Sequence, residues 1–427
     1  MNYREMNPSQ LASELEGLRK KYEDYKALGL KLDMSRGKPD SEQLDLSQGM
    51  LNIVSDPAEC VSENGFDCRN YGLMDGIPES KRLFSELLDI PADNMIVCGN
   101  SSLNLMYDAV ARAMIYGVYT KNGCKPWFGQ NVKFICPVPG YDRHFGICES
   151  LGIGMINVDM TETGPDMDAV EALVADDASI KGIWVVPKYS NPCGTTCSDE
   201  TVRRLAGLKP AAPDFRIFWD NAYIIHDIYE KSDPLLNLFT EAARMGNPDM
   251  PLIFFSTSKI TFPGAGVALV AASDNNINQF KSVMKYQTIG FDKLNQIRHV
   301  KFFKNAGRIR EHMKLHAALL RPKFDAVLAA FERELKPVGV GEWFAPRGGY
   351  FISLNLPDGT ARRTFDLCNG LGLKLTDAGA TFPYGKDPLD RNLRIAPSYP
   401  ALPELEKASA VLCLCAKIAA VEKALAC

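Results

Sequence analysis

Two short apolar runs decide the fold of this chain: "FRIFWDNAY", residues 215–223, and "PLIFFSTSK", residues 251–259. Neither run alternates apolar with polar residues, which is typical of strands buried on both faces of a parallel sheet. Each ends in polar residues, with Asp220 in the first and Lys259 in the second. Ligands bind at the carboxyl ends of such strands, so both side chains are candidates for a site. Lys259 is open to three interpretations: a surface ammonium, a phosphate anchor or an amine that forms an imine.

The same pattern of strands and helices extends toward the N-terminus. Further strands are predicted at "NMIVCGN", "NVKFICPVPG", "GIGMINVDM" and "KGIWVVP", which lie between residues 94 and 187. Helical segments such as "SSLNLMYDAVARAM" and "SDETVRRLAGL" accompany them. Strands that alternate with helices predict an α/β fold with a largely parallel sheet covered on both faces. We assign residues 51–300 to this large domain.

A smaller α+β domain is predicted for residues 301–427. It begins with a long helical region at 301–334 and continues with "GGYFISLNL", a helix near 361–371, the strand "NLRIAP" and a final helix. Residues 7–28 predict an N-terminal helix that is capped by Asn7 and has Pro8 at its first position. Residues 1–50 are expected to join the small domain.

Composition argues against several classes of protein. The net charge is −4 and the basic residues are spread along the chain, so no nucleic-acid partner is expected. No stretch reaches the roughly 18 apolar residues of a membrane-spanning helix, so no membrane partner is expected. The N-terminus is polar and lacks the apolar core of a secretion signal, which favours a cytoplasmic protein. The 12 cysteines have no disulfide-framework spacing and are expected to be reduced.

Polar side chains also follow several of the other predicted strands. Asn100, Ser101 and Ser102 lie at a strand-to-helix junction, where they either cap the helix or form part of a phosphate site. Asn191 lies in "SNPCGT" after another strand, although Asn-Pro is also a common turn. The carboxylate of Asp220 lies at the end of a buried strand, where it requires a cationic partner or several hydrogen-bond donors. A role as a helix cap or in a core salt bridge would also explain this residue.

These positions together match the needs of one cofactor. Pyridoxal phosphate requires an amine for an imine, an anion at its pyridine nitrogen, donors at its phenolic oxygen and a phosphate cradle. The residues that would meet these needs, in that order, are Lys259, Asp220, Asn191 with Tyr223, and Ser101 with Ser256.

The order of the motifs carries a resemblance to a known family. The motifs are "NYGLMDG", "GNSSL", "PGYDRHF", "SNPCGT", "DNAY", "STSK" and "NLRIAPS", and they cover nearly the whole chain. With them the chain resembles the fold-type I pyridoxal-phosphate aminotransferases of the aspartate aminotransferase superfamily, and within it a MocR-like bacterial branch. The resemblance implies a seven-stranded, mostly parallel sheet in the large domain. It also implies transfer of an amino group between an amino acid, best aspartate or glutamate, and a 2-oxo acid.

The resemblance implies a role for each matching residue around the cofactor ring. Lys259 matches the Schiff-base lysine, which must be neutral to attack and can later move a proton at the substrate α-carbon. Asp220 matches the aspartate that keeps the pyridine nitrogen protonated. Asn191 and Tyr223 match the donors to the phenolic oxygen. Tyr141 matches the aromatic residue stacked on the ring, although core packing would also explain it.

Phosphate and substrate contacts follow from the same resemblance. Arg394 matches the arginine that binds the substrate α-carboxylate, with Arg391 as a rival three residues earlier and Asn191 beside the substrate. Gly37, between Arg36 and Lys38, matches the loop that closes over the substrate. Tyr71 matches a tyrosine that reaches the phosphate of the neighbouring subunit, which implies a homodimer with shared active sites. The phosphate-binding positions are matched by Asn100, Ser101, Ser102 and Ser256.

Two departures from the family pattern affect charge recognition. The family places an arginine several residues after the lysine to hold the phosphate, and here the position is Gly266. The phosphate charge would then be met by hydroxyl groups, by the helix N-terminus, or by a basic residue such as Lys285, Lys293 or Arg298, and the sequence does not choose among these. The arginine that binds the side-chain carboxylate in typical aspartate enzymes also has no clear counterpart.

Other functions fit parts of the pattern. The same cofactor supports β-elimination or decarboxylation, but Arg394 favours reactions that retain the α-carboxylate. A ligand-sensing module of a MocR-type regulator would need a DNA-binding domain, and only about three dozen residues precede "SRGKPD". His312 and His316 are four residues apart, but residue 313 is Met and other ligands are not evident, so we expect a solvated helix face and no metal.

Overall fold

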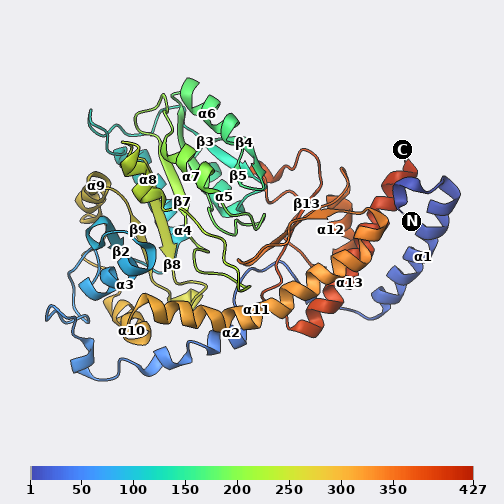
Figure 1. Cartoon of the computed structure of the whole chain (residues 1–427), viewed down its shortest axis with the longest axis horizontal. Helices are drawn as coiled ribbons and strands as arrows, with labels where there is room; N and C mark the ends of the chain where they lie inside the picture. Colours follow the sequence, from blue (N-terminus) through green and yellow to red (C-terminus); the bar gives the residue numbers. More distant parts are fainter. Residues whose placement is uncertain (1, 427) are drawn as a thin grey trace.

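An eight-stranded sheet forms the centre of the larger part of the molecule in the computed structural model, which describes residues 2–426 (Figure 1). The neighbours from β8 to β4 are parallel, whereas β9 runs antiparallel to both of its neighbours. The expected α/β class with a mostly parallel sheet is thus confirmed. In spatial order the strands are β2 (Met95–Val97), β9 (Ala268–Ala271), β8 (Pro251–Ser256), β7 (Arg216–Asp220), β6 (Ile180–Val185), β3 (Lys133–Val138), β4 (Gly154–Thr161) and β5 (Gly164–Pro165).

The sheet has one strand more than the seven that were expected. The additional strand is β5, which pairs antiparallel with the end of β4 at the edge of the sheet. It contains only two residues, Gly164 and Pro165. A segment of two residues has no hydrophobic period, so no sequence pattern could predict it.

Helices cover both faces of the large sheet. The side chains of β7 show why, because Ile217 and Trp219 contribute to one buried core and Phe218 to the core on the opposite face. The first face is covered by α3 (Pro78–Leu88), α6 (Met167–Asp176), α7 (Asp199–Ala206), α8 (Leu238–Arg244) and α10 (Lys293–Phe303). The opposite face is covered by α4 (Ser102–Tyr116), α5 (Asp142–Ser150) and α9 (Asp274–Met284).

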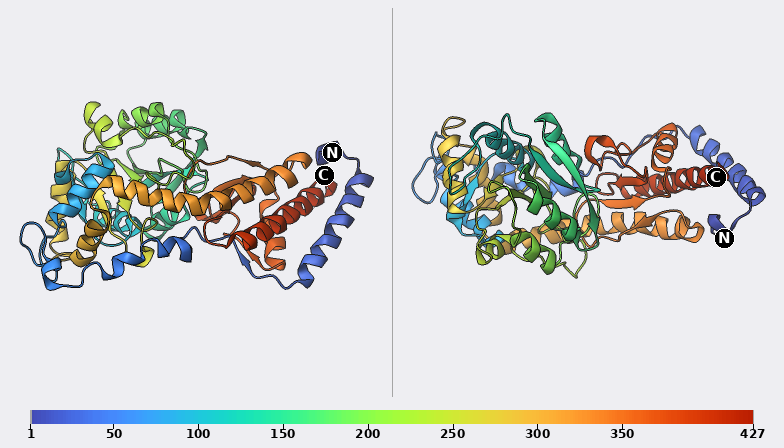
Figure 2. Two further views of the ribbon diagram at one scale, coloured as in Figure 1. Left: turned by 60° about the horizontal axis from the view of Figure 1, so that its bottom comes forward. Right: turned by 90° about the horizontal axis from the view of Figure 1, so that it is seen from above.

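The smaller part of the molecule contains a three-stranded antiparallel sheet packed on long helices (Figure 2). Its strands are β10 (Glu342–Trp343), β11 (Ile352–Asn355) and β13 (Asn392–Ile395), and a separate parallel pair joins β1 (Leu32–Asp33) to β12 (Leu373–Lys374). The helices are α11 (Ala306–Glu334), α12 (Ala361–Gly370) and α13 (Leu402–Ala426). Helix α11 contributes side chains to the cores of both parts. The division at residues 50 and 300 therefore stays a prediction.

The N-terminal helix α1 (Pro8–Ala27) packs against α13 in the same chain. Its start agrees with the sequence, because Asn7 and Gln10 form reciprocal side-chain-to-backbone hydrogen bonds. Leu11, Leu15 and Leu18 are buried in the core of the smaller part. The short helix α2 (Ser41–Asp45) then leads toward the large sheet, beneath α11 in Figure 1.

The parallel strands β3, β6, β7 and β8 bring their carboxyl ends to one edge of the sheet. Four predicted site positions lie at or just beyond these ends: Asp220 and Ser256 are the last residues of β7 and β8, and Tyr141 and Asn191 follow β3 and β6. Within residues 2–426, no helix is long and apolar enough to cross a membrane, and no two cysteines form a disulfide. The fold therefore collects the polar side chains where an α/β sheet binds its ligands.

Candidate active site

The amine of Lys259 lies close enough to the carboxylate of Asp220 for their charges to interact. Lys259 follows β8, and its Nζ lies 5.0 Å from the ring centroid of Tyr223 and 6.0 Å from that of Tyr350. Burial lowers the pKa of Lys259, and the negative charge of Asp220 offsets part of this shift. The neutral amine, which is the nucleophilic form, is therefore more accessible than in an ordinary lysine.

Asp220 has one carboxylate oxygen that is paired and one that is not. The side chain is 3% exposed, and Oδ2 lies 3.2 Å from Nε2 of His144. Oδ1 is buried and has no hydrogen-bond partner within residues 2–426. A buried carboxylate oxygen without a donor is unfavourable, so a bound group with an N–H donor would fit there. The protonated pyridine nitrogen of pyridoxal phosphate is such a donor.

His144 is a site residue that the sequence analysis missed. Its ring stacks on Trp184 at 4.5 Å with an interplanar angle of 12°, and it meets Tyr141 edge-on at 5.0 Å. Residue 144 lies in the motif "PGYDRHF", three positions after Tyr141 and on the first turn of α5. No helix was predicted for this segment, so the (i, i+3) spacing from Tyr141, which places both residues on one face of a helix, could not be used.

Three further predicted residues, Asn191, Tyr223 and Tyr141, lie near Arg394 or Asp220. Asn191 Oδ1 accepts from Arg394 Nη1 at 3.4 Å. Burial raises the pKa of Tyr223, and the charges of Tyr141 and Asp220 raise it further. Burial also raises the pKa of Tyr141, with a smaller contribution from Asp220. Both tyrosines are therefore neutral donors at physiological pH, as a phenolate oxygen would require.

Arg394 is held by several partners and not by one. Nη1 donates to Asp142 Oδ1 at 2.6 Å, Nη2 donates to Thr376 Oγ1 at 3.3 Å, and the guanidinium lies 5.0 Å from the ring centroid of Phe351. The rival Arg391 lies 4.0 Å from Asp358 and is partly exposed. Of the two arginines, the structure brings only Arg394 to the cavity of Asn191.

The loop of Gly37 reaches this region from the N-terminal segment. A Cβ atom at Gly37 would lie 2.1 Å from the ring of Phe351, so the backbone passes directly over that ring. Its neighbours point elsewhere, because Arg36 pairs with Asp33 at 3.6 Å and Lys38 lies 4.0 Å above the ring of Tyr399. Residue 37 must therefore be glycine, because its backbone lies against the ring of Phe351, which in turn lies beside Arg394.

The predicted phosphate cradle is assembled at the N-terminus of α4. Ser256 Oγ donates to Ser258 Oγ at 3.0 Å, and Ser258 Oγ donates to the carbonyl oxygen of Asn100 at 3.2 Å. Ser101 is the N-cap residue of α4 but forms no side-chain cap. The first backbone N–H groups of α4, beginning at Ser102, are thus not capped by this side chain, and such groups bind anions.

Gly266 lies at the same cradle, and its identity has a steric reason. A Cβ atom there would lie 2.9 Å from the carbonyl oxygen of Asn100 and 3.4 Å from the amide nitrogen of Ser258. An arginine at this position would not fit unless the backbone moved. The close contact between the loops of Asn100 and Gly266 therefore explains why the family's usual phosphate arginine is absent here.

Some predicted residues do not meet the others in the described protomer. Tyr71 is 77% exposed and makes no side-chain hydrogen bond within residues 2–426 to the cavity residues. Lys285 is exposed beside the ring of Tyr286. Lys293 donates to the carbonyl oxygen of Phe291 at 3.2 Å.

The expectation that His312 and His316 lie on a solvated helix face is wrong. Both are buried, and their Nε2 atoms lie 2.9 and 3.0 Å from the carbonyl oxygen of Ile260, the residue after Lys259. Gln43 Nε2 lies 3.1 Å from Nδ1 of His316, because the N-terminal segment covers this face of α11. Within residues 2–426 no group of His, Cys, Asp and Glu could hold a metal.

Comparisons with known proteins agree with this geometry. The profile of the family described as "Aspartate amino-transferase" matches residues 6–426. The aspartate aminotransferase of Corynebacterium glutamicum is 42% identical, over 95% of this chain and 94% of that protein. The crystal structure of an aspartate transaminase from the same species has 40% identity and a TM-score of 0.96, and covers 99% of both chains.

A more distant structure shares only the fold. It is the α-aminoadipate aminotransferase of Thermus thermophilus, complexed with N-(5'-phosphopyridoxyl)-L-leucine, with 19% identity, a TM-score of 0.71 and 93% coverage of both chains. Two relatives at 40% identity or more over nearly the full length and one family profile agree on the reaction class. The chain therefore belongs to the aspartate aminotransferase family and is a fold-type I aminotransferase.

Proposed function

We propose that this aminotransferase uses pyridoxal phosphate, linked to Lys259, to move an amino group between L-aspartate or L-glutamate and a 2-oxo acid. One observation carries the proposal: buried Asp220 has an unpartnered Oδ1 and lies within electrostatic reach of a lysine whose pKa is lowered. A fold-supporting salt bridge would leave neither feature, because both Asp220 oxygens and the ammonium would be paired.

The residues around the ring would have distinct tasks. When bound, pyridoxal phosphate supplies an aldehyde that condenses with amines and a ring that accepts electrons from the substrate α-carbon. Asp220 holds a proton on the ring nitrogen, and His144 orients Asp220 through Oδ2. Asn191 and Tyr223 donate to the phenolic oxygen. Lys259 moves a proton at the substrate α-carbon, and its lowered pKa keeps the amine available as a base.

Arg394 would bind the substrate α-carboxylate with its planar guanidinium. The partners Asn191 and Thr376 fix the plane of that group. A retained carboxylate disfavours decarboxylation, whereas β-elimination needs the same removal of the α-proton, so the base alone does not separate it from amino transfer. Both similar proteins are named as enzymes that act on aspartate, which supports a dicarboxylic amino acid as the substrate here.

Arg298 is our choice for the missing phosphate cation. It lies one helical turn after Asn295, whose Nδ2 donates to the carbonyl oxygen of Gly266 at 2.9 Å. Its Nε is buried and has no hydrogen-bond partner among the residues that the structure describes. Lys285 is exposed and Lys293 is bonded to a backbone carbonyl, so neither has the same reason to take an anion.

The reaction is tested with a panel of amino acids added singly to the cofactor-loaded protein. Bleaching of the visible absorbance by L-aspartate or L-glutamate, and its return with 2-oxoglutarate or oxaloacetate, is the expected result. Response to neither acid would refute the substrate class. Release of CO₂ would favour the decarboxylase, and release of free ammonia would favour the lyase, because amino transfer releases neither.

The proposal includes a cytoplasmic homodimer in which exposed Tyr71 enters the partner's site. Mixing inactive Lys259→Ala chains with Tyr71→Ala chains tests it, because a hybrid dimer regains one site with both residues intact. Recovery of part of the activity is expected. No recovery after subunit exchange would contradict shared sites.

A further inference from the structure

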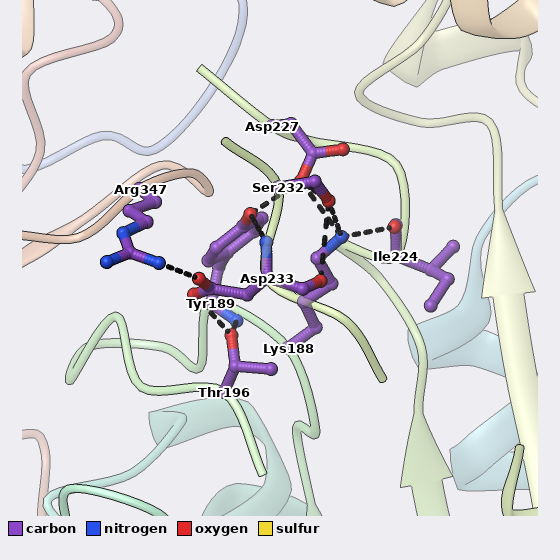
Figure 3. Close-up of polar contacts among 8 residues, drawn as sticks. All are labelled: Lys188, Tyr189, Thr196, Ile224, Asp227, Ser232, Asp233 and Arg347. Atoms are coloured by element: carbon purple, nitrogen blue, oxygen red, sulfur yellow. Dashed lines mark hydrogen bonds and ion pairs between the residues drawn. The ribbon is translucent and has the colours of Figure 1, made fainter. Parts of the chain in front are cut away.

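A polar cluster, in which Lys188 and Tyr189 are buried, joins the candidate active site to the smaller part of the molecule. It consists of Lys188, Tyr189, Asp227, Ser232, Asp233 and Arg347, which we call the Tyr189 cluster (Figure 3). Its members come from three separate segments: the loop after β6, the loop after β7 and the turn before β11. None of them has a task in the proposed reaction, yet a buried lysine such as Lys188 is unusual without one.

Tyr189 has an unfavourable backbone conformation at the centre of this cluster. Its φ is +48°, in the left-handed region that bulky residues rarely adopt, and its side chain is 1% exposed. Such a conformation persists only where surrounding contacts enforce it, and it is enriched at functional sites. The contacts of the phenol and of the ring should therefore show what is being enforced.

The phenol is bonded on both sides. Its oxygen donates to Asp227 Oδ1 at 2.5 Å and accepts from the backbone N–H of Asp233 at 3.2 Å. Lys188 Nζ lies 2.9 Å from the same Asp227 oxygen. Burial acts to raise the pKa of Asp227, but the bonds from Tyr189 and Lys188 outweigh it and the pKa is lowered. The carboxylate is therefore a charged acceptor that holds the phenol firmly.

The ring is enclosed by the turn before β11. A Cβ atom at Gly348 would lie 2.2 Å from Cε2 of Tyr189, and one at Gly349 would lie 2.8 Å from its Cβ. The backbone N–H of Gly349 donates to the carbonyl oxygen of His226 at 2.9 Å. On the outer side Arg347 Nη1 donates to Asp233 Oδ1 at 2.9 Å. The turn thus has room for glycines only and is locked onto both loops.

Each of the three segments carries a residue of the candidate active site close to its contact with Tyr189. Asn191 follows two positions later in the same loop, Tyr223 precedes Asp227 by four positions, and Tyr350 follows Gly349 directly. Tyr223 and Tyr350 are the two rings next to Lys259 Nζ. A displacement of Tyr189 would therefore move all three relative to the amine.

We propose that Tyr189 is a positioning residue, which fixes Asn191 and Tyr223 relative to Lys259 without itself touching cofactor or substrate. The inference rests on the proposed function, because Asn191 and Tyr223 matter to the reaction only as donors to the cofactor. A mere fold-stabilising role for Tyr189 is the competing explanation, and the experiment must separate the two.

The test compares Tyr189→Phe with Tyr229→Phe. Tyr229 is a matched control because its phenol also donates to a carboxylate, Asp325 of α11, at 2.6 Å. In Tyr189→Phe the kcat should fall by about 10-fold, with KM changed by less than about 2-fold, since small displacements near the reacting atoms are costly. The pH midpoint of the cofactor absorbance should rise by about 0.5 units or more, because weaker donors leave the phenolic oxygen more basic. Tyr229→Phe should change neither quantity.

A second readout does not depend on the cofactor. Two backbone hydrogen bonds close the loop that carries Asn191. The amide of Ser190 donates to the carbonyl oxygen of Thr195 at 2.9 Å, and the amide of Gly194 donates to the carbonyl oxygen of Ser190 at 2.7 Å. Their hydrogen exchange should be faster in Tyr189→Phe than in the unmodified protein, and unchanged in Tyr229→Phe. If the two variants agree in exchange, kcat and absorbance midpoint, Tyr189 only supports the fold and the proposal is overturned.

Two further outcomes also decide. Faster loop exchange in a protein that binds no pyridoxal phosphate would support loop positioning while removing the proposed function. If Tyr189→Phe does not fold, Arg347→Gln weakens the same cluster from its exposed side, where the Arg347 side chain is 47% exposed. Faster exchange of the same two amides is then expected, and unchanged exchange would overturn the proposal.

Discussion

Replacement of Asp142 by Asn should strengthen the binding of substrate carboxylates. Asp142 Oδ1 lies 2.6 Å from Nη1 of Arg394, the arginine proposed for the α-carboxylate. The carboxylate of Asp142 therefore takes part of the hydrogen-bonding capacity that the substrate needs, and its charge repels the substrate. Asp142 also lies 3.9 Å from the exposed Arg143, which offers it a second partner when a substrate enters.

The size of the effect follows from the geometry of this ion pair. A charged hydrogen bond contributes about 1.5–3 kcal/mol. The Asp142 side chain is 28% exposed, so solvent screening reduces the figure to about 1–2 kcal/mol. We therefore expect the Kd of a non-reacting dicarboxylate to fall by about 5- to 30-fold in Asp142→Asn.

The assay is a titration of the cofactor-loaded protein with succinate, followed by absorbance or calorimetry. Asp168→Asn is the matched control, because Asp168 forms an Asp–Arg pair of the same length, 2.6 Å, with Arg204 on the surface. The control should leave the Kd unchanged. A Kd that rises in Asp142→Asn would refute the reasoning, because it would mean that Asp142 holds Arg394 in the binding position.

Three other changes have defined outcomes. Arg298→Gln should raise the Kd for pyridoxal phosphate by about 10-fold in a fluorescence titration, as expected for the loss of one charged hydrogen bond. The control Lys285→Gln, at an exposed residue, should leave this Kd unchanged. A larger increase of the Kd in Lys285→Gln than in Arg298→Gln would reject Arg298 as the phosphate cation. Burial lowers the pKa of His316 to about 4, so the unfolded chain binds more protons between about pH 4 and 6.5 and stability rises with pH there, by up to about 1.4 kcal/mol per unit. In His316→Gln the slope of thermal midpoint against pH should be shallower, and an equal slope would contradict that shift. Gly266→Ala should lose about 1–3 kcal/mol of stability in a denaturant titration, because the new Cβ would meet the carbonyl oxygen of Asn100. Gly264→Ala should lose less, because there is open space at its Cβ. Equal losses would reject the close approach of Gly266 to Asn100.

The sequence predicted those parts of the site that lie on buried strands. Strands β7 and β8 appear in the sequence as largely apolar runs; Asp220 ends the first, and Lys259 follows the end of the second by three residues, so both lie toward the ligand-binding edge. Asp220 and Lys259 could therefore be named without a structure. The N-terminal helix was also predictable, because Asn7 and Gln10 are close in sequence and form a local cap.

Residues that depend on tertiary contacts could not be predicted. His316 is buried because Gln43, far away in the sequence, covers its helix face. His144 contacts Asp220, which is 76 residues away in the sequence. Tyr189 has a left-handed backbone that no local residue pattern announces, since bulky side chains disfavour it. In each case the deciding contact joins segments that share no period or spacing.

The central claim is that the amine of Lys259 and the carboxylate of Asp220 act on one cofactor ring. Borohydride reduction of the cofactor-loaded protein, followed by peptide mass spectrometry, tests it most directly. We predict a phosphopyridoxyl group on Lys259 alone, a colourless Lys259→Ala variant, and in Asp220→Asn a label on the same lysine with transamination lowered by at least about 100-fold. A label on another lysine, or an equally coloured and reducible Lys259→Ala protein, would contradict the account.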